Sequence, residues 1–209
     1  MKLTWLGHAS FRLEDKAVVY FDPFKVEGKH DADIILVSHG HYDHCDTGSI
    51  SRLLKDDTIV LCPESCISKI EGNVTAMNAG EAVTVKDVRV EAHPAYNTNK
   101  PNHPEGEGLG FVVESSGRRV YHAGDTDLIP EMGELGRVDA ALLPVGGTYT
   151  MDWKEATEAV KLIKPAIAVP MHYGDIVGSA KDALKFADMV RAETKTKAAI
   201  LKQGESTEL

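Results

Sequence analysis

The sequence has few of the features that mark secreted, membrane or nucleic-acid-binding proteins. Only three of its 209 residues are cysteines, Cys45, Cys62 and Cys66. Neither their odd number nor their spacing fits a disulfide framework or a zinc-binding CxxC pair. No apolar run reaches the roughly 18 residues of a transmembrane helix, and the N-terminal stretch MKLTWLGHASFRLED has no apolar signal-peptide core. We therefore expect a soluble, cytoplasmic protein.

Positive charge is also scarce. The chain has 23 Lys and Arg against 32 Asp and Glu, which gives a formal net charge of −9. Such a balance argues against a protein that coats a phosphate backbone, so no nucleic-acid partner is expected. No linker divides the chain, and we predict one domain over residues 1–209 that acts on a small molecule without membrane insertion. The sequence leaves the oligomeric state open, a homo-oligomer included.

Short apolar or aromatic runs dominate the first half, and helical patterns alternate with strand patterns in the second. Strands are predicted at 2–7, 10–14, 17–22, 32–39, 58–63, 73–77, 82–93, 108–115, 118–125, 138–147, 166–174 and 198–204. Helices are predicted at 46–56, 151–165 and 179–194, the last with Leu184, Ala187 and Val190 facing inward. This order predicts an α/β domain of layered sheets with helices packed outside them.

Four residues able to bind metal ions follow a buried strand pattern within six positions. The stretch ILVSHGHYDHCD contains His39, His41, Asp43 and His44. In an extended backbone, residues i and i+2 point to the same side, so the first two histidines can share one ion. Imidazole suits zinc, iron or nickel, and a carboxylate with a further imidazole can serve a second ion. A loop between a buried strand and a helix is where α/β sheets carry their sites, so the stretch predicts a metal centre.

The segment SHGHYDH fits HxHxDH, the motif of the metallo-β-lactamase superfamily, and it stands in order among WLGHAS, FDPF, HAGDT, PVGGTYTM and PMHYG. Over essentially its whole length the chain resembles the small single-domain metal-dependent hydrolases of that superfamily. These are related to its ascorbate-6-phosphate lactonase and N-acyl-phosphatidylethanolamine phospholipase D branch. The resemblance implies a four-layer αββα sandwich, two mixed sheets with helices on the outer faces. It also implies that Asp125 of HAGDT lies between two ions and that His172 of PMHYG binds the second.

The third histidine of the first ion is open between two candidates in the segment EAHPAYNTNKPNHPEGEG. His93 lies at a predicted strand end, and His103 lies further along the loop. Relatives of the phospholipase branch carry PAxH, which places Asn97 where they have a histidine. Because the asparagine departs from that pattern, we favour His103 over His93.

Other polar residues are candidates for supporting roles. His8 ends the first predicted strand and is expected beside the metal pocket, where it holds a neighbouring group or contacts substrate, with a core histidine as the alternative. Asp22 is expected to orient the histidine loop, because such carboxylates fix imidazole tautomers. His122 lies three positions before the HAGDT aspartate, so strand alternation turns it to the other face, as a core or supporting residue. Thr148 and Tyr149 are candidate donors to the pocket, with a tight turn as the alternative.

The implied ligand sets are His39, His41 and His103 for one ion and Asp43, His44 and His172 for the other, with Asp125 between them. Two ions about 3.5–4 Å apart can hold a hydroxide, because metal binding lowers the pKa of water to about 7. That hydroxide would attack a small ester, lactone or phosphodiester, with Asp43 or a metal-bound water as the general acid. The expected cofactors are two divalent ions, Zn²⁺ first and Mn²⁺, Ni²⁺ or Fe²⁺ as alternatives.

Two other functions compete with hydrolysis: a mononuclear iron oxygenase on the same fold, and a non-catalytic metal-binding protein. The presence of Asp43, His44 and His172 together favours a second filled position, and the full ligand set argues against a non-catalytic role. The substrate stays unnamed, because it would be read by loops whose spacing follows no rule.

Overall fold

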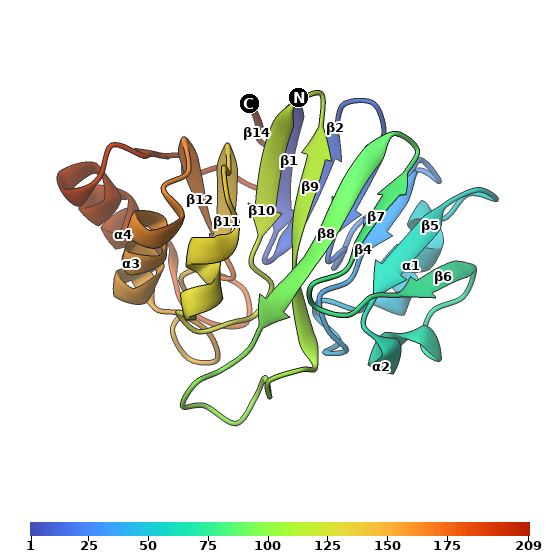
Figure 1. Cartoon of the computed structure of the whole chain (residues 1–209), viewed down its shortest axis with the longest axis horizontal. Helices are drawn as coiled ribbons and strands as arrows, with labels where there is room; N and C mark the ends of the chain where they lie inside the picture. The colour runs from blue at the N-terminus through green and yellow to red at the C-terminus, as the bar shows by residue number, and fades with distance from the viewer.

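Two seven-stranded mixed sheets form the centre of the computed structural model, which describes residues 1–209 (Figure 1). The first sheet has the order β14 (Ser206–Glu208), β1 (Lys2–Gly7), β2 (Ser10–Glu14), β3 (Val18–Phe21), β4 (Ile34–Leu36), β5 (Ile59–Cys62), β6 (Asn73–Ala76). The second has the order β13 (Lys197–Ala198), β12 (Ile167–Met171), β11 (Ala140–Pro144), β10 (Arg118–His122), β9 (Gly108–Ser115), β8 (Val88–Ala95), β7 (Ala82–Val85).

Each sheet has an antiparallel part and a parallel part. Strands β3 to β6 are parallel in the first sheet, and β10 to β13 are parallel in the second. Strand β4 consists of Ile34, Ile35 and Leu36, all fully buried, because it is covered on both faces. The carboxyl ends of parallel strands meet at one edge of a sheet, so β4, β10 and β12 deliver the residues that follow them to a common region.

Helices cover the outer faces of both sheets. Helices α1 (Thr47–Leu53) and α2 (Glu64–Ile67) lie on the first sheet, and α3 (Trp153–Ile163) and α4 (Ala180–Glu193) lie on the second; a short 3-10 helix, η1 (Pro130–Glu134), precedes β11 (Figure 1). The main core lies between the sheets and includes Phe11, Phe21 and Phe111. A smaller core under α1 includes Ile35 and Ile50. The predicted four-layer αββα sandwich is therefore confirmed.

The helix boundaries follow the capping residues of the sequence. Asp152 and Glu155 form a capping box at the start of α3, and Ser179 with Asp182 does the same for α4. The prediction that Leu184 faces inward is wrong, since its side chain is 55% exposed. The buried positions of α4 are 183, 186, 187 and 190, and residue 184 stands about 100° away from 183 on a 3.6-residue helix.

The predicted strand over 198–204 is also wrong. Only Lys197–Ala198 pairs with the second sheet, and the chain then crosses to the first sheet, where it forms β14 beside β1. The backbone N–H of Trp5 donates to the carbonyl of Glu205 over 3.1 Å at this crossing. The apolar residues after Ala198 therefore lie in the connection between the two sheets and do not extend β13.

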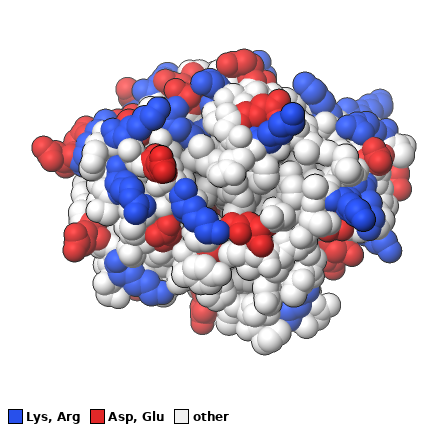
Figure 2. All heavy atoms as spheres, turned by 180° about the vertical axis from the view of Figure 1, so that it is seen from behind, with Lys and Arg blue, Asp and Glu red and all other residues white.

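Both termini lie at one edge of the sandwich, whereas the loop between β8 and β9 projects from the opposite edge (Figure 1). None of the helices has the length and apolarity that a bilayer span requires. On the face seen in Figure 2, acidic and basic side chains are interspersed and form no continuous basic stripe. The loop edge is where the polar residues singled out in the sequence come together.

Candidate metal centre

The loop after β4 turns sharply. The backbone N–H groups of His44 and Cys45 both donate to the carbonyl of His41, over 3.1 and 2.8 Å. This tight turn brings Asp43 and His44 back toward the side chain of His39. The six-residue motif thereby presents ligands on two sides of one point.

Three histidines form the first ligand group: His39, His41 and His103. The distance from Nδ1 of His41 to Nε2 of His39 is 3.0 Å, and to Nε2 of His103 it is 3.3 Å. Nitrogens bound tetrahedrally to zinc at 2.0–2.1 Å lie about 3.3 Å apart. His39 and His103 are buried, whereas His41 is exposed. The group therefore has the spacing of a metal site and one open side.

The second ligand group consists of Asp43, His44 and His172, and His8 lies against it. Their ligand atoms lie within 4.8 Å of one another, and all four residues are buried. They come from different parts of the chain: the loop after β4, the end of β12 and the end of β1. The second group is therefore largely buried and is assembled from the loop after β4 and the carboxyl ends of two strands.

Asp125, which follows β10, lies between the two groups. Its Oδ1 is 3.3 Å from Nε2 of His44, and its Oδ2 is 3.1 Å from Nε2 of His172. The same Oδ2 is 3.3 Å from Nε2 of His103 in the first group. One carboxylate thus touches both groups, as a bridging ligand would.

Several of these atoms are buried without a hydrogen-bond partner: Nε2 of His44, Nε2 of His172 and Oδ1 of Asp125. They lie close to one another but lack hydrogen-bond geometry. Buried polar atoms without partners are costly, because each loses its bonds to water. A cation among them would satisfy these lone pairs, so the residues fit divalent metal ions.

Burial controls the protonation of the first group. It lowers the pKa of His39 well below the ordinary range, and the neighbouring His44 lowers it further. Burial also lowers the pKa of His41, with His103 adding to the effect. Both imidazoles are therefore neutral at pH 7, the form that binds a metal.

For His44 and Asp125, which lie where the two groups meet, neighbouring charges change the pKa more than burial does. Burial alone would lower the pKa of His44, but Asp125 and Asp22 raise it well above the ordinary value. Burial alone would raise the pKa of Asp125, but His172 and His44 hold it well below its usual range. Without a metal ion the positive charge of His44 balances these carboxylates, and an arriving cation would take its place.

The acid expected behind the histidine loop, Asp22, lies under it. Its Oδ2 is 2.7 Å from Nδ1 of His44, and both of its oxygens accept hydrogen bonds from Ser38. The hydroxyl of Ser38 is also 3.0 Å from Nδ1 of His39. This arrangement leaves the Nε2 atoms of both histidines pointing at the centre. The sequence did not predict a role for Ser38, because no spacing rule distinguishes a serine that precedes HxHxDH.

His8 touches the second group directly. Its Nε2 is 3.0 Å from Oδ2 of Asp43, and its ring centroid is 4.1 Å from that of His172. The carbonyl of His8 accepts from the indole of Trp5 and from the backbone N–H of His172, each over 3.0 Å. His8, Asp22 and His172 all have positive φ, of 51°, 40° and 59°. Such strained backbone is found at functional sites, where surrounding contacts hold it in place.

The two candidates for the third histidine have different surroundings. His103 lies in the first group, and Oδ1 of Asn97 accepts a hydrogen bond from its backbone N–H and lies 3.1 Å from its Nδ1. His93 lies on β8 with its Nε2 3.5 Å from Glu91, outside both groups. Asn97, noticed in the sequence only as a departure from PAxH, therefore positions His103.

His122 lies outside the ligand groups, where strand alternation placed it. Its Nε2 contacts the carbonyl of Ala9 at 2.8 Å, and its ring stacks on Phe21 at 5.2 Å. Gly146 of PVGGTYTM passes so close to His172 that a Cβ atom there would lie 2.4 Å from the carbonyl oxygen of that residue. Only glycine fits this approach, which holds the end of β12 in position.

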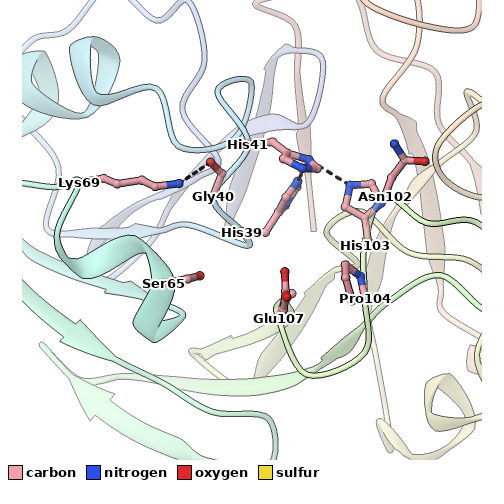
Figure 3. Close-up of a pocket in the computed structure, with 10 residues that line it drawn as sticks. His39, Gly40, His41, Ser65, Lys69, Asn102, His103, Pro104 and Glu107 are labelled. Atoms are coloured by element: carbon pink, nitrogen blue, oxygen red, sulfur yellow. Dashed lines mark hydrogen bonds between the residues drawn. The ribbon is translucent and has the colours of Figure 1, made fainter.

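Two cavities open beside the metal centre. The tyrosine cavity, of about 280 Å³, lies over the second group; it is lined by His41, Tyr42, Asp43, Asn102, His103, Asp125, Tyr149, His172 and Ile176. The lysine cavity, of about 190 Å³, is lined by His39, Gly40, His41, Ser65, Lys69, Asn102, His103, Pro104, Glu107 and Gly108. Figure 3 shows His41, His103 and Asn102 on one side of the lysine cavity and Lys69 and Ser65 on the other.

Comparison with known proteins agrees with this geometry. Residues 2–172 match the family described as the beta-lactamase superfamily domain. The chain is 43% identical over 187 residues to a metal-dependent hydrolase of Thermoplasma acidophilum, covering 83% of each chain. It is 37% identical over 230 residues to one of Archaeoglobus fulgidus, covering 100% of this chain and 99% of the relative.

Among solved structures, a metallo hydrolase from Ignicoccus hospitalis is similar with a TM-score of 0.83 and 28% identity, covering 100% of this chain and 98% of the other. The sandwich fold and these relatives point to the same family. The chain belongs to the metallo-β-lactamase superfamily and is a metal-dependent hydrolase.

Proposed function

We propose that this hydrolase works with two divalent metal ions. His39, His41 and His103 would hold one, Asp43, His44 and His172 the other, with Asp125 shared between them. The observation that carries the proposal is the position of Asp125, whose carboxylate lies 3.3 Å from His103 in one group and 3.1 and 3.3 Å from His172 and His44 in the other. Five imidazoles among the ligands favour Zn²⁺, with Mn²⁺, Ni²⁺ and Fe²⁺ as alternatives.

Two ions held there would supply a hydroxide at neutral pH and would polarise the bond under attack in a small ester, lactone or phosphodiester. The protein contributes the arrangement of its ligands. Asp22 and Ser38 fix the tautomers of His44 and His39, so that both present Nε2 to the centre. The burial of His39, His44, Asp125 and His172 keeps water from most of the ligand atoms, which strengthens the charge interactions among them.

Asp43 is the residue we propose for proton transfer. Burial would raise the pKa of its carboxyl, but the hydrogen bond from His8 and the charge of His44 hold that pKa below its ordinary value. The carboxylate is therefore ionised at pH 7 and can accept a proton before it returns one to the leaving group. Its place in the wall of the tyrosine cavity gives it access to substrate.

The surroundings of the site support a small-molecule substrate and no nucleic-acid partner. The tyrosine cavity of about 280 Å³ lies near the lower limit of the volumes of small-ligand sites. The net charge of −9 and the interspersed charges on the face seen in Figure 2 argue against nucleic-acid binding. Three cysteines are all free and buried, which supports a reducing, cytoplasmic location.

The test is the metal content of protein purified without chelators, measured together with hydrolysis of bis-p-nitrophenyl phosphate and a panel of small esters and lactones. We expect two ions per chain and hydrolysis that is lost on metal removal and restored by Zn²⁺. A single iron with oxygen consumption and no hydrolysis would replace the proposal with an oxygenase. Bound metal with neither activity would point to a non-catalytic binding protein.

A further inference from the structure

The two cavities beside the metal centre differ in chemistry. The tyrosine cavity has Tyr42, Tyr149 and Ile176 in its wall and no lysine or arginine. The lysine cavity has only polar residues, glycines and a proline, and Lys69 shares it with Glu107 (Figure 3). Only the tyrosine cavity reaches Asp43, Asp125 and His172. The reacting part of a substrate would therefore lie in the tyrosine cavity, which has the more apolar wall.

Two tyrosine side chains in the wall of the tyrosine cavity are exposed to solvent. The side chains of Tyr42 and Tyr149 are 68% and 38% exposed. The other large hydrophobic side chains with comparable exposure, Leu162 and Leu184, lie on helices α3 and α4 away from the cavity. Exposed aromatic side chains beside a buried polar site are typical of ligand recognition.

The position of Tyr42 is fixed by its neighbours. It lies between two ligands in sequence, and its ring meets Phe24 edge-on, with centroids 6.0 Å apart at 74°. Nζ of Lys25 lies 4.7 Å from the Phe24 ring centroid and 2.7 Å from Asp175. This exposed ion pair joins the loop under Tyr42 to the loop that carries Ile176.

The position of Tyr149 is tied to the first ligand group. Its carbonyl accepts a hydrogen bond from Nδ2 of Asn97 over 2.9 Å and lies 3.2 Å from Nδ1 of His103. The backbone that fixes this ligand therefore also fixes the tyrosine. The backbone of Tyr149 and the ring of Tyr42 are thus each linked to residues around the metal centre.

We propose that the tyrosine cavity binds an uncharged, planar group, an aryl group or a flat lactone ring, next to the bond that is hydrolysed. The inference rests on the proposed function and narrows its substrate class. Planar groups gain from offset or edge-on contact with the tyrosine rings. A cavity of about 280 Å³ accommodates one ring with its ester group.

A second anionic group on the substrate would be poorly accommodated. The charged residues in the wall of the tyrosine cavity, apart from histidines, are the carboxylates Asp43 and Asp125. Lys25, whose Nζ lies over the ring of Phe24, is paired with Asp175. A phosphate that is not itself bound by the metal ions would therefore lose water without gaining a cation. This favours neutral aryl esters or lactones over substrates that would place a phosphate in the tyrosine cavity.

Hydroxamates provide the test, because their two oxygens bind a metal ion while their substituent probes the cavity. We measure the affinity of the zinc-loaded protein for acetohydroxamate, benzohydroxamate and para-phosphonobenzohydroxamate by isothermal titration calorimetry. Benzohydroxamate should bind about tenfold more tightly than acetohydroxamate, and the phosphonate should cancel that gain. Tyr42→Ala and Tyr149→Ala should each lower benzohydroxamate affinity several-fold more than acetohydroxamate affinity. Leu184→Ala, an exposed apolar truncation on α4, is the matched control and should change neither.

Equal affinity for acetohydroxamate and benzohydroxamate would overturn the inference, and so would tighter binding of the phosphonate. Loss of the aromatic preference in Leu184→Ala as well would show that it does not depend on the tyrosines. Failure of acetohydroxamate to bind the zinc-loaded protein would instead contradict the open metal centre of the proposed function. The two failures are therefore distinguishable.

Discussion

The two ligand groups are built differently although they share Asp125. The second group, Asp43, His44 and His172, is buried, and its members are held from behind by Asp22 and His8. The first group includes His41, which is exposed. It also depends on His103, which comes from a long loop and is held by Asn97. One group is preformed by strand ends, and the other is completed by loops.

This difference suggests that the two ligand groups contribute differently to metal binding and to substrate access. A buried site with fixed ligands binds its ion with little reorganisation, whereas a site with an exposed ligand leaves room for substrate or solvent to approach. His41 lines both cavities, and only the first group has a member so exposed. Changes in one group should therefore have effects distinct from changes in the other.

The largest effect on metal binding and activity is expected at Asp125, the carboxylate that both ligand groups share. Asp125→Asn keeps the shape of the side chain but removes the charge that faces both groups. We expect loss of both ions in metal analysis and a fall in hydrolytic activity of at least about a thousandfold. Asp139→Asn, at a buried carboxylate bound to Arg118 and Arg119 elsewhere on the second sheet, should keep both ions. Two tightly bound ions in Asp125→Asn would refute the shared position.

A smaller effect should follow when the first group alone is opened. His103→Ala removes the ligand supplied by the loop, and we expect the affinity for one ion to fall by at least about a hundredfold while the other stays bound. The matched variant His93→Ala removes an imidazole beside Glu91 and should leave both affinities near normal. Competition with a zinc chelator measures both. The opposite pattern would transfer the ligand role to His93.

The second group can be weakened through His8. Asp43 is ionised and accepts only, so Nε2 of His8 donates to it and Nδ1 is left as a lone pair without a partner. In His8→Asn the amide cannot reach Asp43, and we expect the second ion to bind about tenfold to a hundredfold more weakly. His8→Gln places an N–H near the original Nε2 and should recover much of that loss.

The backbone makes this pair of variants decisive. Position 8 has φ of 51°, where asparagine is more comfortable than glutamine. Better metal binding in His8→Gln than in His8→Asn would therefore report the hydrogen bond rather than backbone strain. Equal binding in the two variants and the parent would remove His8 from the site. The ligand-field spectrum of the Co²⁺-loaded proteins gives a second readout.

The smallest expected effect is the dependence of metal affinity on pH. In the metal-free protein carboxylates raise the pKa of His44 well above 6.5, whereas burial lowers those of His39 and His41. A proton must leave His44 before an ion binds, so acid competes with metal at the second group from a higher pH than at the first. The second affinity should fall about tenfold per pH unit while that one proton competes. Calorimetric titrations from pH 8 to 5.5 would contradict this if the first affinity fell earlier.

Much of the fold followed from local patterns in the sequence. The buried run that became β4 and the helical patterns that became α1, α3 and α4 each follow a short-range periodicity. The strand expected over 198–204 failed because its end is set by a crossing between sheets, which no local pattern records.

The ligand candidates came from a motif, but their supports did not. HxHxDH marks His39 and His44 in the sequence, whereas Ser38 is recognisable only once Asp22 lies 2.6 Å from it. The cavity walls contain residues far apart in sequence, such as Tyr42 and Tyr149, whose proximity depends on the whole fold. Sequence therefore located the chemistry, and structure was needed for the shape around it.

The most direct test of two ions shared by Asp125 is anomalous diffraction from crystals of the zinc-loaded protein, recorded at the zinc absorption edge. We predict two peaks about 3.5–4 Å apart. One should lie among His39, His41 and His103, the other among Asp43, His44 and His172, with Asp125 between them. A single peak at full zinc loading would contradict this account, as would a pair of peaks that Asp125 does not touch.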